Sequence, residues 1–284
     1  MDNDLRQQAI ALYDRFTHEG MDRRLFMRRM TALAGSAVAA EALIGSIAAS
    51  PAAAAIVLED DKRLRTGMAE IASYKVYAAE PVKRARKGTI LVIHENRGLN
   101  AHIKDVARRL ALEGLHAVAP DMLSPSGGTP ANDDAARNEI GKLDLAAATG
   151  AAVAMIDEIK RRSHGKVGAV GFCWGGAFVN RLAVAAGDKL DAGVVYYGPA
   201  PNASEAPKVQ ASLMIHLAGL DDRVAQTAFP WITALRAAGK RVTYFGYDGV
   251  NHAFNNDTSA ERYNKPAADL AWKRTLRFFK RQLS

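Results

Sequence analysis

The chain has 284 residues, of which 49% are hydrophobic and 24% are charged, and it carries a formal net charge of +8. This composition excludes a disordered chain, because the apolar surface is large enough to offset the entropy lost on folding. The single cysteine excludes an intrachain disulfide and a Cys-rich zinc module.

The net charge is carried by residues 56–284, since residues 1–55 contain six Arg and six acidic residues. Two basic clusters stand out, Lys83–Lys87 and Lys160–Arg162. Neither contains an aromatic residue that could stack on bases, so we expect no nucleic-acid partner. The clusters indicate a solvated basic surface, or a field that attracts anionic substrates.

Residues 1–58 form an extension with its own pattern. Asp4–Phe16 has apolar residues at helical spacing, which predicts a short amphipathic helix. Asp22–Arg28 reads DRRLFMR and resembles a twin-arginine export signal. The Ala-rich run Thr31–Ala55 follows and ends in small residues such as Ala52–Ala54, as signal peptides do.

Two interpretations of this extension stay open. The first is export to the periplasm, with a mature N-terminus between about Ala49 and Ile56. The second is a cytoplasmic protein with a retained helical extension, in which Leu12, Tyr13 and Phe16 would be buried against the main domain or a partner subunit. Glu41 inside the apolar run favours retention. We expect no stable membrane span, because Ala and Gly supply little transfer energy.

From residue 67 onward, short β-rich runs alternate with helical stretches. This alternation predicts one α/β domain over residues 67–284, with a mostly parallel, doubly wound sheet flanked by helices. Leu123–Asp134 is expected to be its longest irregular loop. The expected strands are Ile71–Ala78, Thr89–His94, His116–Ala119, Val167–Gly171, Gly193–Tyr197, Leu213–Leu217 and Val242–Tyr247. The expected helices are His102–Glu113, Asp144–Arg162, Gly175–Ala186, Thr227–Ala238 and Ala267–Leu283.

The segment Gly171–Gly176 reads GFCWGG and lies between a predicted strand and a predicted helix. This is the pattern of a nucleophile elbow, with Cys173 where serine is commoner. The flanking glycines suit a tight turn in which side chains would collide. The backbone N–H of Trp174 then lies at a helix N-terminus, where it can donate to a developing oxyanion.

A thiol nucleophile needs a base and a group that orients the base, and in α/β-hydrolase order the acid precedes the histidine. His252 follows the last predicted strand, and Asp221 follows the strand before it. Asp222 and Asp248 are rival acids. His94 and His216 also end strands, but each lies too early in the chain for that order. No HExxH or similar spacing occurs, so we expect no metal, and no cofactor is indicated.

Five segments together resemble the dienelactone hydrolase family, also called carboxymethylenebutenolidases. They are His94–Asn100 (HENRGLN), Ala119–Asp121 (APD), Gly171–Gly176, Gly219–Asp221 (GLD) and Asn251–Phe254 (NHAF). The resemblance spans roughly residues 67–284. It implies an α/β-hydrolase fold and a Cys-His-Asp triad of Cys173, His252 and Asp221.

The resemblance also implies two further site groups. Glu95 matches the glutamate that contacts the resting thiol in the family, where it can keep the thiol protonated until substrate arrives. The alternative for Glu95 is an ion pair with Arg97 or a helix cap. The backbone N–H of Asn96 matches the second oxyanion donor, beside that of Trp174.

One departure concerns the substrate. Dienelactone hydrolases clamp the substrate carboxylate with two arginines, and the matching stretches here, Met122–Pro125 and Asn255–Asp257, contain none. Arg97, Arg223 or Arg262 could supply a different anion contact. The sequence therefore predicts a hydrolase of small esters or lactones, anionic ones included. The alternatives are a non-catalytic binding protein on this scaffold, or a thioesterase or peptidase with the same triad.

Overall fold

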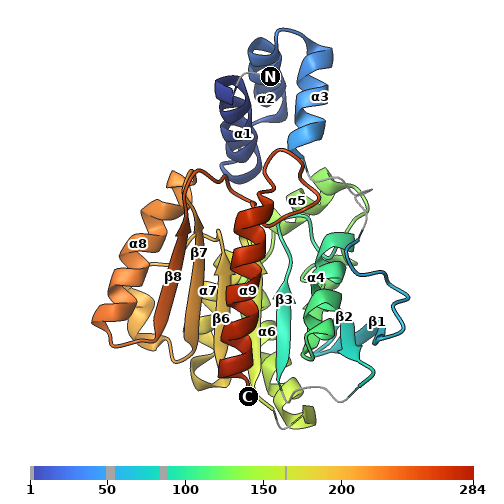
Figure 1. Cartoon of the computed structure of the whole chain (residues 1–284), viewed down its shortest axis with the longest axis vertical. Helices are drawn as coiled ribbons and strands as arrows, with labels where there is room; N and C mark the ends of the chain where they lie inside the picture. Colours follow the sequence, from blue (N-terminus) through green and yellow to red (C-terminus); the bar gives the residue numbers. More distant parts are fainter. Residues whose placement is uncertain (1–2, 49–54, 84–87, 164) are drawn as a thin grey trace.

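The computed structural model describes residues 3–48, 55–83, 88–163 and 165–284 (Figure 1). The strands are β1 (Leu64–Ile71), β2 (Tyr74–Pro81), β3 (Thr89–Ile93), β4 (His116–Pro120), β5 (Val167–Phe172), β6 (Ala192–Tyr196), β7 (Ser212–Ala218) and β8 (Val242–Tyr247). The α-helices are α1 (Asn3–His18), α2 (Arg23–Ala34), α3 (Ala37–Ile47), α4 (Ala101–Leu112), α5 (Asp133–Gly141), α6 (Leu145–Ser163), α7 (Trp174–Ala185), α8 (Asp222–Ala237) and α9 (Lys265–Gln282). Three short 3₁₀ turns are η1 (Ser124–Ser126), η2 (Gly187–Lys189) and η3 (Ala203–Lys208).

The strands form one sheet of eight, in the order β1-β2-β4-β3-β5-β6-β7-β8. The run from β4 to β8 is parallel, and β1 and β2 pair antiparallel at one end. Every residue of β3, β5, β6 and β7 is buried. Strands that are covered by helices on both faces are buried throughout, which is why their sequences are continuously apolar. The predicted α/β-hydrolase fold is confirmed.

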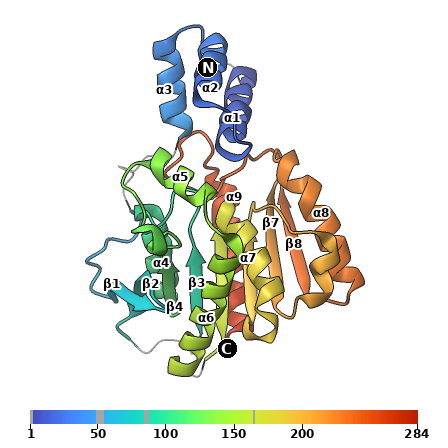
Figure 2. The same ribbon diagram turned by 180° about the vertical axis from the view of Figure 1, so that it is seen from behind.

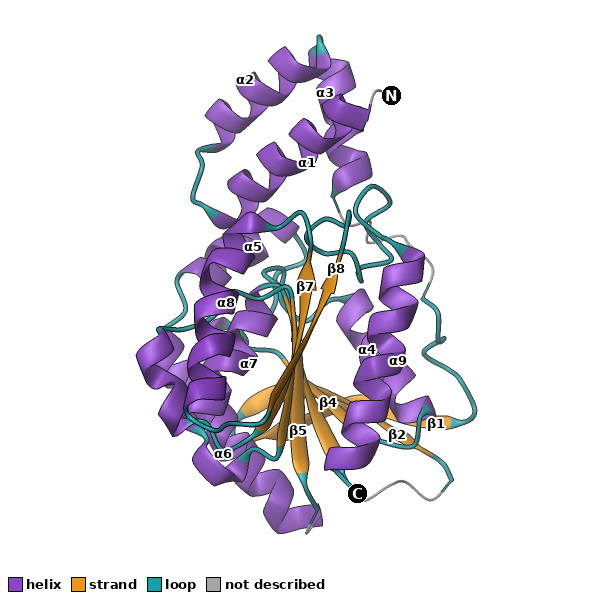
Figure 3. Cartoon of the chain, turned by 60° about the vertical axis from the view of Figure 1, so that its left-hand side comes forward, coloured by secondary structure: helices purple, strands orange, loops and turns teal. Residues whose placement is uncertain are grey.

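Helices cover both faces of this sheet (Figure 3). Helices α4 and α9 lie on one face, where Ile103, Val106 and Phe279 are buried. Helices α6, α7 and α8 lie on the other, where Ile156 and Trp231 are buried (Figure 2). This arrangement brings the carboxyl ends of the parallel strands to one edge of the sheet, which is where ligands bind in open α/β folds.

The predicted strand Ile71–Ala78 is wrong in its form. The chain makes a hairpin there, and β1 and β2 meet at Ala72 and Ser73. Both residues have positive φ, 50° and 65°, which a two-residue hairpin turn needs. Gly or Asn usually supplies this conformation, so Ala-Ser gave no turn signal in the sequence.

The predicted irregular loop Leu123–Asp134 contains more regular structure than expected. The turn η1 lies inside it, and Asp133 already begins α5, a nine-residue helix that the sequence analysis missed. Helix α5 buries only Ala136 and Ile140, and two buried positions are too few for a helical pattern to be recognised in the sequence. The side chain of Asn132 caps its start by accepting the N–H of Ala135.

Helices α1, α2 and α3 form a separate three-helix unit, which we call the amino-terminal unit (residues 3–48). It lies over the carboxyl edge of the sheet, at the top of Figure 1. The unit has its own core, in which the rings of Phe16 and Phe26 stack with centroids 4.1 Å apart. Leu12 and Tyr13 are also buried there. The predicted helix Asp4–Phe16 is confirmed as α1.

Among the described residues, no single helix is both long and apolar enough to cross a membrane. Helices α2 and α3 satisfy the length and composition test only as a pair, and they meet at an angle of 105°. The small-residue sites at Ala52–Ala54 and most of the basic cluster Lys83–Lys87 lie outside the described residues.

Candidate active site

Cys173 lies at the turn between β5 and α7, as the elbow pattern predicts. Its φ of 56° and ψ of −115° are unusual for a non-glycine residue. A Cβ at Gly171 would lie 2.0 Å from the carbonyl oxygen of Gly175, and one at Gly175 would lie 2.4 Å from that of His94. The two glycines are therefore required by the close approach of backbone, and they hold the Cys173 thiol at the carboxyl edge of the sheet.

His252 and Asp221 come from loops after β8 and β7. The Nδ1–H of His252 donates to Oδ2 of Asp221 at 2.5 Å, and both side chains are buried. Oδ1 of Asp221 accepts the backbone N–H of Val224, which fixes the carboxylate at the start of α8. The Nε2 atom of His252 is buried with no hydrogen-bond partner among the described residues. A ring nitrogen of His252 lies within 4.8 Å of the Cys173 sulfur.

The electrostatics of this group favour a charged histidine. Burial opposes protonation of His252, but the Cys173 sulfur and the Asp221 carboxylate outweigh it and raise the pKa of His252 to about 10. Burial likewise opposes ionisation of Asp221, yet the hydrogen bond from His252 holds the pKa of this carboxyl below its usual value. The hydrogen bond to the Asp221 carboxylate therefore favours the charged form of His252 next to the Cys173 sulfur.

The rival residues lie elsewhere. Asp222 and Asp248 are exposed, and neither contacts His252 in the described structure. His94 is buried against the Trp174 ring and accepts the N–H of Met122. His216 bonds Tyr247 and Thr275, and burial lowers the pKa of His216 to about 3. Both histidines are neutral core residues.

Glu95 is buried beside the same group. Its Oε2 accepts from Nδ2 of Asn256 at 2.7 Å, and its Oε1 has no partner among the described residues. Glu95 and Cys173 line one small cavity together with His252, but no hydrogen bond joins the carboxylate to the thiol. The sequence analysis missed Asn256, which occupies a stretch it had examined only for arginine.

The two proposed oxyanion donors come from different segments of the chain. Trp174 is the first residue of α7, and Asn96 directly follows Glu95 in the loop after β3. Both line a cavity of about 690 Å³ that also reaches Cys173. Its volume suits a small-molecule ligand.

The three candidate arginines have different surroundings. Arg223 lines the large cavity with Cys173, and no carboxylate among the described residues pairs with it. Arg97 donates to the Tyr13 hydroxyl at 2.6 Å and pairs with Asp133 at 2.9 Å. Arg262 is buried and pairs with Asp14 at 3.2 Å. Of the three, Arg223 is the one placed to meet a ligand in the large cavity.

His18, which the sequence analysis did not single out, also belongs to this site. It is the last residue of α1, and its two ring nitrogens lie 3.8 and 3.9 Å from the Cys173 sulfur. Its ring meets that of His252 edge-on, with centroids 4.8 Å apart. Burial, and then the nearby charge of His252, hold the pKa of His18 well below its usual value. No local motif marks this residue, because long-range packing brings it to the site.

Among the residues that the structure describes, His18, Cys173 and His252 form a group that could hold a metal ion. Their ligand atoms all lie within 4.8 Å of one another. A tetrahedral Zn²⁺ has bonds of about 2.0–2.3 Å to such atoms, so the group would have to contract to bind it. The expectation of no metal stays a prediction.

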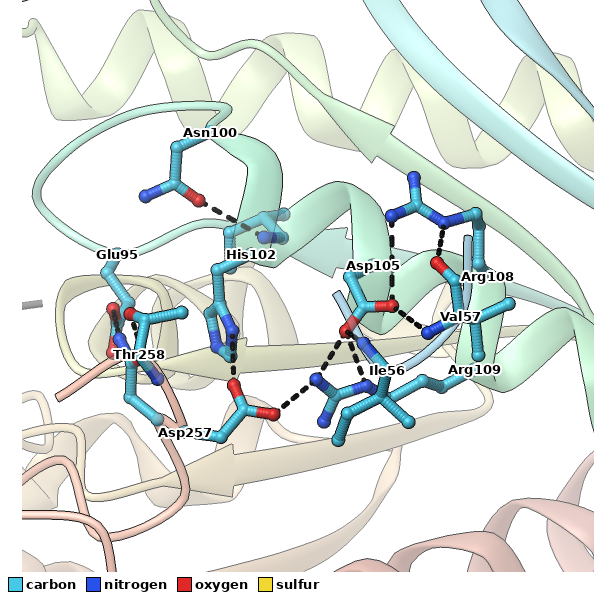
Figure 4. Close-up of polar contacts among 12 residues, drawn as sticks. Ile56, Val57, Glu95, Asn100, His102, Asp105, Arg108, Arg109, Asp257 and Thr258 are labelled. Carbon is cyan, nitrogen blue, oxygen red and sulfur yellow. Dashed lines mark hydrogen bonds and ion pairs between the residues drawn. The ribbon is translucent and has the colours of Figure 1, made fainter. Parts of the chain in front are cut away.

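A charged network anchors the loop that carries His252 (Figure 4). Asp257 lies 3.1 Å from Nδ1 of His102 and 2.5 Å from the guanidinium of Arg109, both on α4. Arg109 also binds Asp105, whose carboxylate accepts the backbone N–H of Val57 at 2.8 Å. Because the network joins three distant segments, sequence spacing gave no sign of it.

Comparison with known proteins identifies the family of the chain. The model of the dienelactone hydrolase family matches residues 74–283. The chain belongs to the dienelactone hydrolase family. Its class is therefore that of carboxylic ester hydrolases with an α/β-hydrolase fold, and the predicted family is confirmed. The matched residues exclude the amino-terminal unit.

Individual members of the family are similar over most of their length. A protein of Escherichia coli O157:H7 named "Putative carboxymethylenebutenolidase" is 30% identical, and the match covers 82% of this chain and 93% of that protein. A protein of the same name from Methylorubrum extorquens is 32% identical over 72% of this chain and 75% of its own. The crystal structure of a dienelactone hydrolase from Klebsiella pneumoniae, titled as putative, is 26% identical with a TM-score of 0.68. It covers 76% of this chain and 98% of that one.

Proposed function

We propose that this protein hydrolyses an ester or lactone of a small molecule through an acyl-enzyme on Cys173, with His252 as base and Asp221 as the group that orients it. The observation that carries the proposal is the convergence of three loops. They bring a thiol at a strand–helix elbow within 4.8 Å of a ring nitrogen of an imidazole whose Nδ1–H donates to a buried carboxylate at 2.5 Å. This order of groups is what nucleophilic acyl transfer requires.

The first half of the reaction forms the acyl-enzyme. The Cys173 thiolate attacks the carbonyl carbon, and the backbone N–H groups of Trp174 and Asn96 stabilise the oxyanion. The Nε2–H of His252 then protonates the leaving alkoxide oxygen as the carbon–oxygen bond breaks. In the second half, Nε2 takes a proton from water, the hydroxide attacks the thioester, and the thiolate leaves with the acid as product. Nε2 suits this role because it is buried and has no hydrogen-bond partner by distance and angle among the described residues.

We further propose that the substrate carries a negative charge near the ester. None of the described residues that line the 690 Å³ cavity is acidic, whereas Arg223, Arg137 and Lys142 all reach it. Arg137 and Lys142 pair with Asp134 and Glu139, so Arg223 is the cation available to a carboxylate. This contact would replace the arginine clamp that the sequence lacks.

Glu95 is proposed to control the resting thiol, as its family position implies. Its buried and unpartnered Oε1 supports the proposal, because a buried acceptor without a donor is costly unless a thiol or substrate proton meets it.

Intact-mass analysis tests the proposal. The wild type is mixed with activated esters and lactones, neutral and carboxylate-bearing, and with thioesters and peptides, and is quenched in acid. We expect an acyl adduct on Cys173 with each accepted substrate, and faster acylation by the anionic members. Arg223→Gln should remove that preference, with Arg236→Gln on the far part of α8 as the control. Adducts only with thioesters or peptides would indicate the alternative substrate classes. No adduct and no turnover would indicate a binding protein.

A further inference from the structure

The amino-terminal unit makes contacts with the hydrolase domain that surround the reactive sulfur. The Tyr13 hydroxyl accepts from Arg97, Asp14 pairs with buried Arg262, and the Thr17 carbonyl accepts from the Asn96 amide at 3.3 Å. These contacts come from one face of α1 and reach the loops after β3 and β8. The unit is therefore seated on the site itself.

The other two helices of the amino-terminal unit also contact the hydrolase domain. Arg23 of α2 pairs with Asp134 of α5. The carbonyl of Ile47, at the end of α3, accepts from buried Ser259 at 2.6 Å. That of Ser46 accepts the N–H of Glu261 at 3.2 Å. All three helices thus bind the hydrolase domain, and Ser259 and Glu261 lie in the segment that follows His252.

His18 limits the directions from which a substrate can reach the thiol. A carbonyl carbon must come within about 3–3.5 Å of the sulfur for attack. The ring nitrogens of His18 already lie 3.8 and 3.9 Å from it, so that direction is filled. The open direction leads into the 690 Å³ cavity, whose wall includes Phe16, Thr17, His18 and Met21.

We propose that the amino-terminal unit is a permanent part of the active site, in which His18, with Phe16, Thr17, Gly20 and Met21 around it, forms the wall that contacts the acyl group and sets its permitted size. The proposal rests on the proposed acyl transfer at Cys173. His18 acts here as a specificity-determining residue: it contacts substrate, and it transfers no proton. A neutral imidazole suits this position, because it adds no charge beside the imidazolium of His252.

The start of helix α2 gives the twin-arginine-like segment a structural role that does not involve export. The Asp22 side chain accepts the N–H groups of Arg24 and Leu25 and caps α2. Phe26 and Met30 are buried in the core of the unit. The N-cap, the exposed basic residues of the first turn and the two buried apolar residues together stabilise the start of α2. The pattern that resembles an export signal therefore has a structural role within the amino-terminal unit.

The test compares two alkylating reagents of different size on the full-length protein. Cys173 is the only thiol, so iodoacetamide and its bulkier N-phenyl analogue report on it alone. The ratio of their rates cancels any change in the fraction of thiolate. For His18→Ala we expect the bulky reagent to gain about tenfold relative to the small one. His18→Phe should restore a ratio close to that of the wild type, because its ring refills the wall. Glu19→Ala, at the exposed next residue, is the matched control.

A second measurement uses the wild type alone and does not depend on a variant that folds. Acylation of Cys173 should slow hydrogen exchange in the peptide that contains Phe16–Met21, while α9 stays unchanged. The proposal is overturned if His18→Ala leaves the reagent ratio unchanged, or if acylation leaves that peptide unprotected. Failure of the proposed function is a different result, since then the wild type forms no acyl adduct at all.

Discussion

A thiol nucleophile needs a weaker base than a serine hydroxyl does, and the residues around Cys173 are arranged accordingly. The Cys173 sulfur and then the Asp221 carboxylate favour the charged form of the His252 ring. We predict that Cys173→Ala abolishes ester hydrolysis, and that Cys173→Ser leaves a weak remnant because a serine hydroxyl needs a stronger base than a thiol does. Initial rates with a chromogenic ester measure both. Full activity in Cys173→Ala would remove the nucleophile assignment.

Asp221 and His252 form the next pair of tests. His252→Ala should lower kcat by about 10²–10⁴, the usual effect of removing a general base. Asp221→Asn should cost less and should lower the pKa of His252, because the carboxylate favours the charged ring. Nitrogen-15 NMR of the His252 ring measures that pKa. The exposed Asp222→Asn serves as the control. A larger loss of kcat in Asp222→Asn than in Asp221→Asn would indicate that Asp222 is the acid of the triad.

Glu95→Gln separates a chemical role from a structural one. The amide can still accept from Asn256, so the loop should stay in place. If the carboxylate guards the thiol, the variant loses activity and Cys173 reacts with peroxide at a different rate. Activity assays and mass spectrometry of the oxidised thiol measure the two. Wild-type behaviour in both would leave Glu95 as a structural residue.

The chemistry at the elbow was readable from the sequence because it is local. Cys173 and its glycines are neighbours in the chain, and the order of Asp221 and His252 follows from strands that are themselves recognisable. His18 and Asn256 were not readable, because their positions depend on packing between segments far apart in the sequence.

At the scale of elements, long apolar periods were predicted well and short ones poorly. The buried strands β5 and β7 and the long helices α6 and α9 were found nearly in full. The hairpin of β1 and β2 was missed because its turn lacks Gly and Asn, and α5 because it buries two residues. Helix α8 begins at Asp222, five residues before the predicted start, where the side chain that orients His252 also caps the helix.

The loop after β8 depends on helix α4 through Asp257. Burial disfavours the charge of Asp257, but His102 and Arg109 outweigh it and hold the pKa of this carboxyl below its usual value. Such a group stabilises the fold above its unfolded pKa, near 3.8, and the benefit is lost as the pH falls through the lower folded value. Asp257→Asn should therefore lower the free energy of unfolding by about 1–3 kcal/mol at pH 7.

Urea unfolding at several pH values measures this effect. The difference between wild type and Asp257→Asn should be full at neutral pH and should shrink below about pH 4. Asp269→Asn breaks an exposed pair with Lys265 and should cost less than about 1 kcal/mol. Equal losses in the two variants would show that the network does not anchor the loop.

At the scale of the whole molecule, the fate of residues 1–55 is the open question. Export through the twin-arginine-like signal stays a prediction: Arg23→Lys with Arg24→Lys should hold the protein in the cytoplasm of its host, and the mature chain should begin between about Ala49 and Ile56. If the amino-terminal unit is a permanent part of the active site, active enzyme from the native host should begin at Met1 or Asp2. N-terminal sequencing of purified, active protein distinguishes the two.

The seating of the amino-terminal unit on the segment after His252 imposes an order on biosynthesis. The unit is translated before its partners Ser259 and Glu261, and 212 positions separate Ser259 from Ile47. Cys173 leaves the ribosome before either of them, and translation proceeds at about 5–20 residues per second. For several seconds each nascent chain therefore carries Cys173 without His252 and without the residues on which the amino-terminal unit is seated. We expect the thiol to become reactive towards substrate only after the segment that follows His252 has been made and has bound that unit.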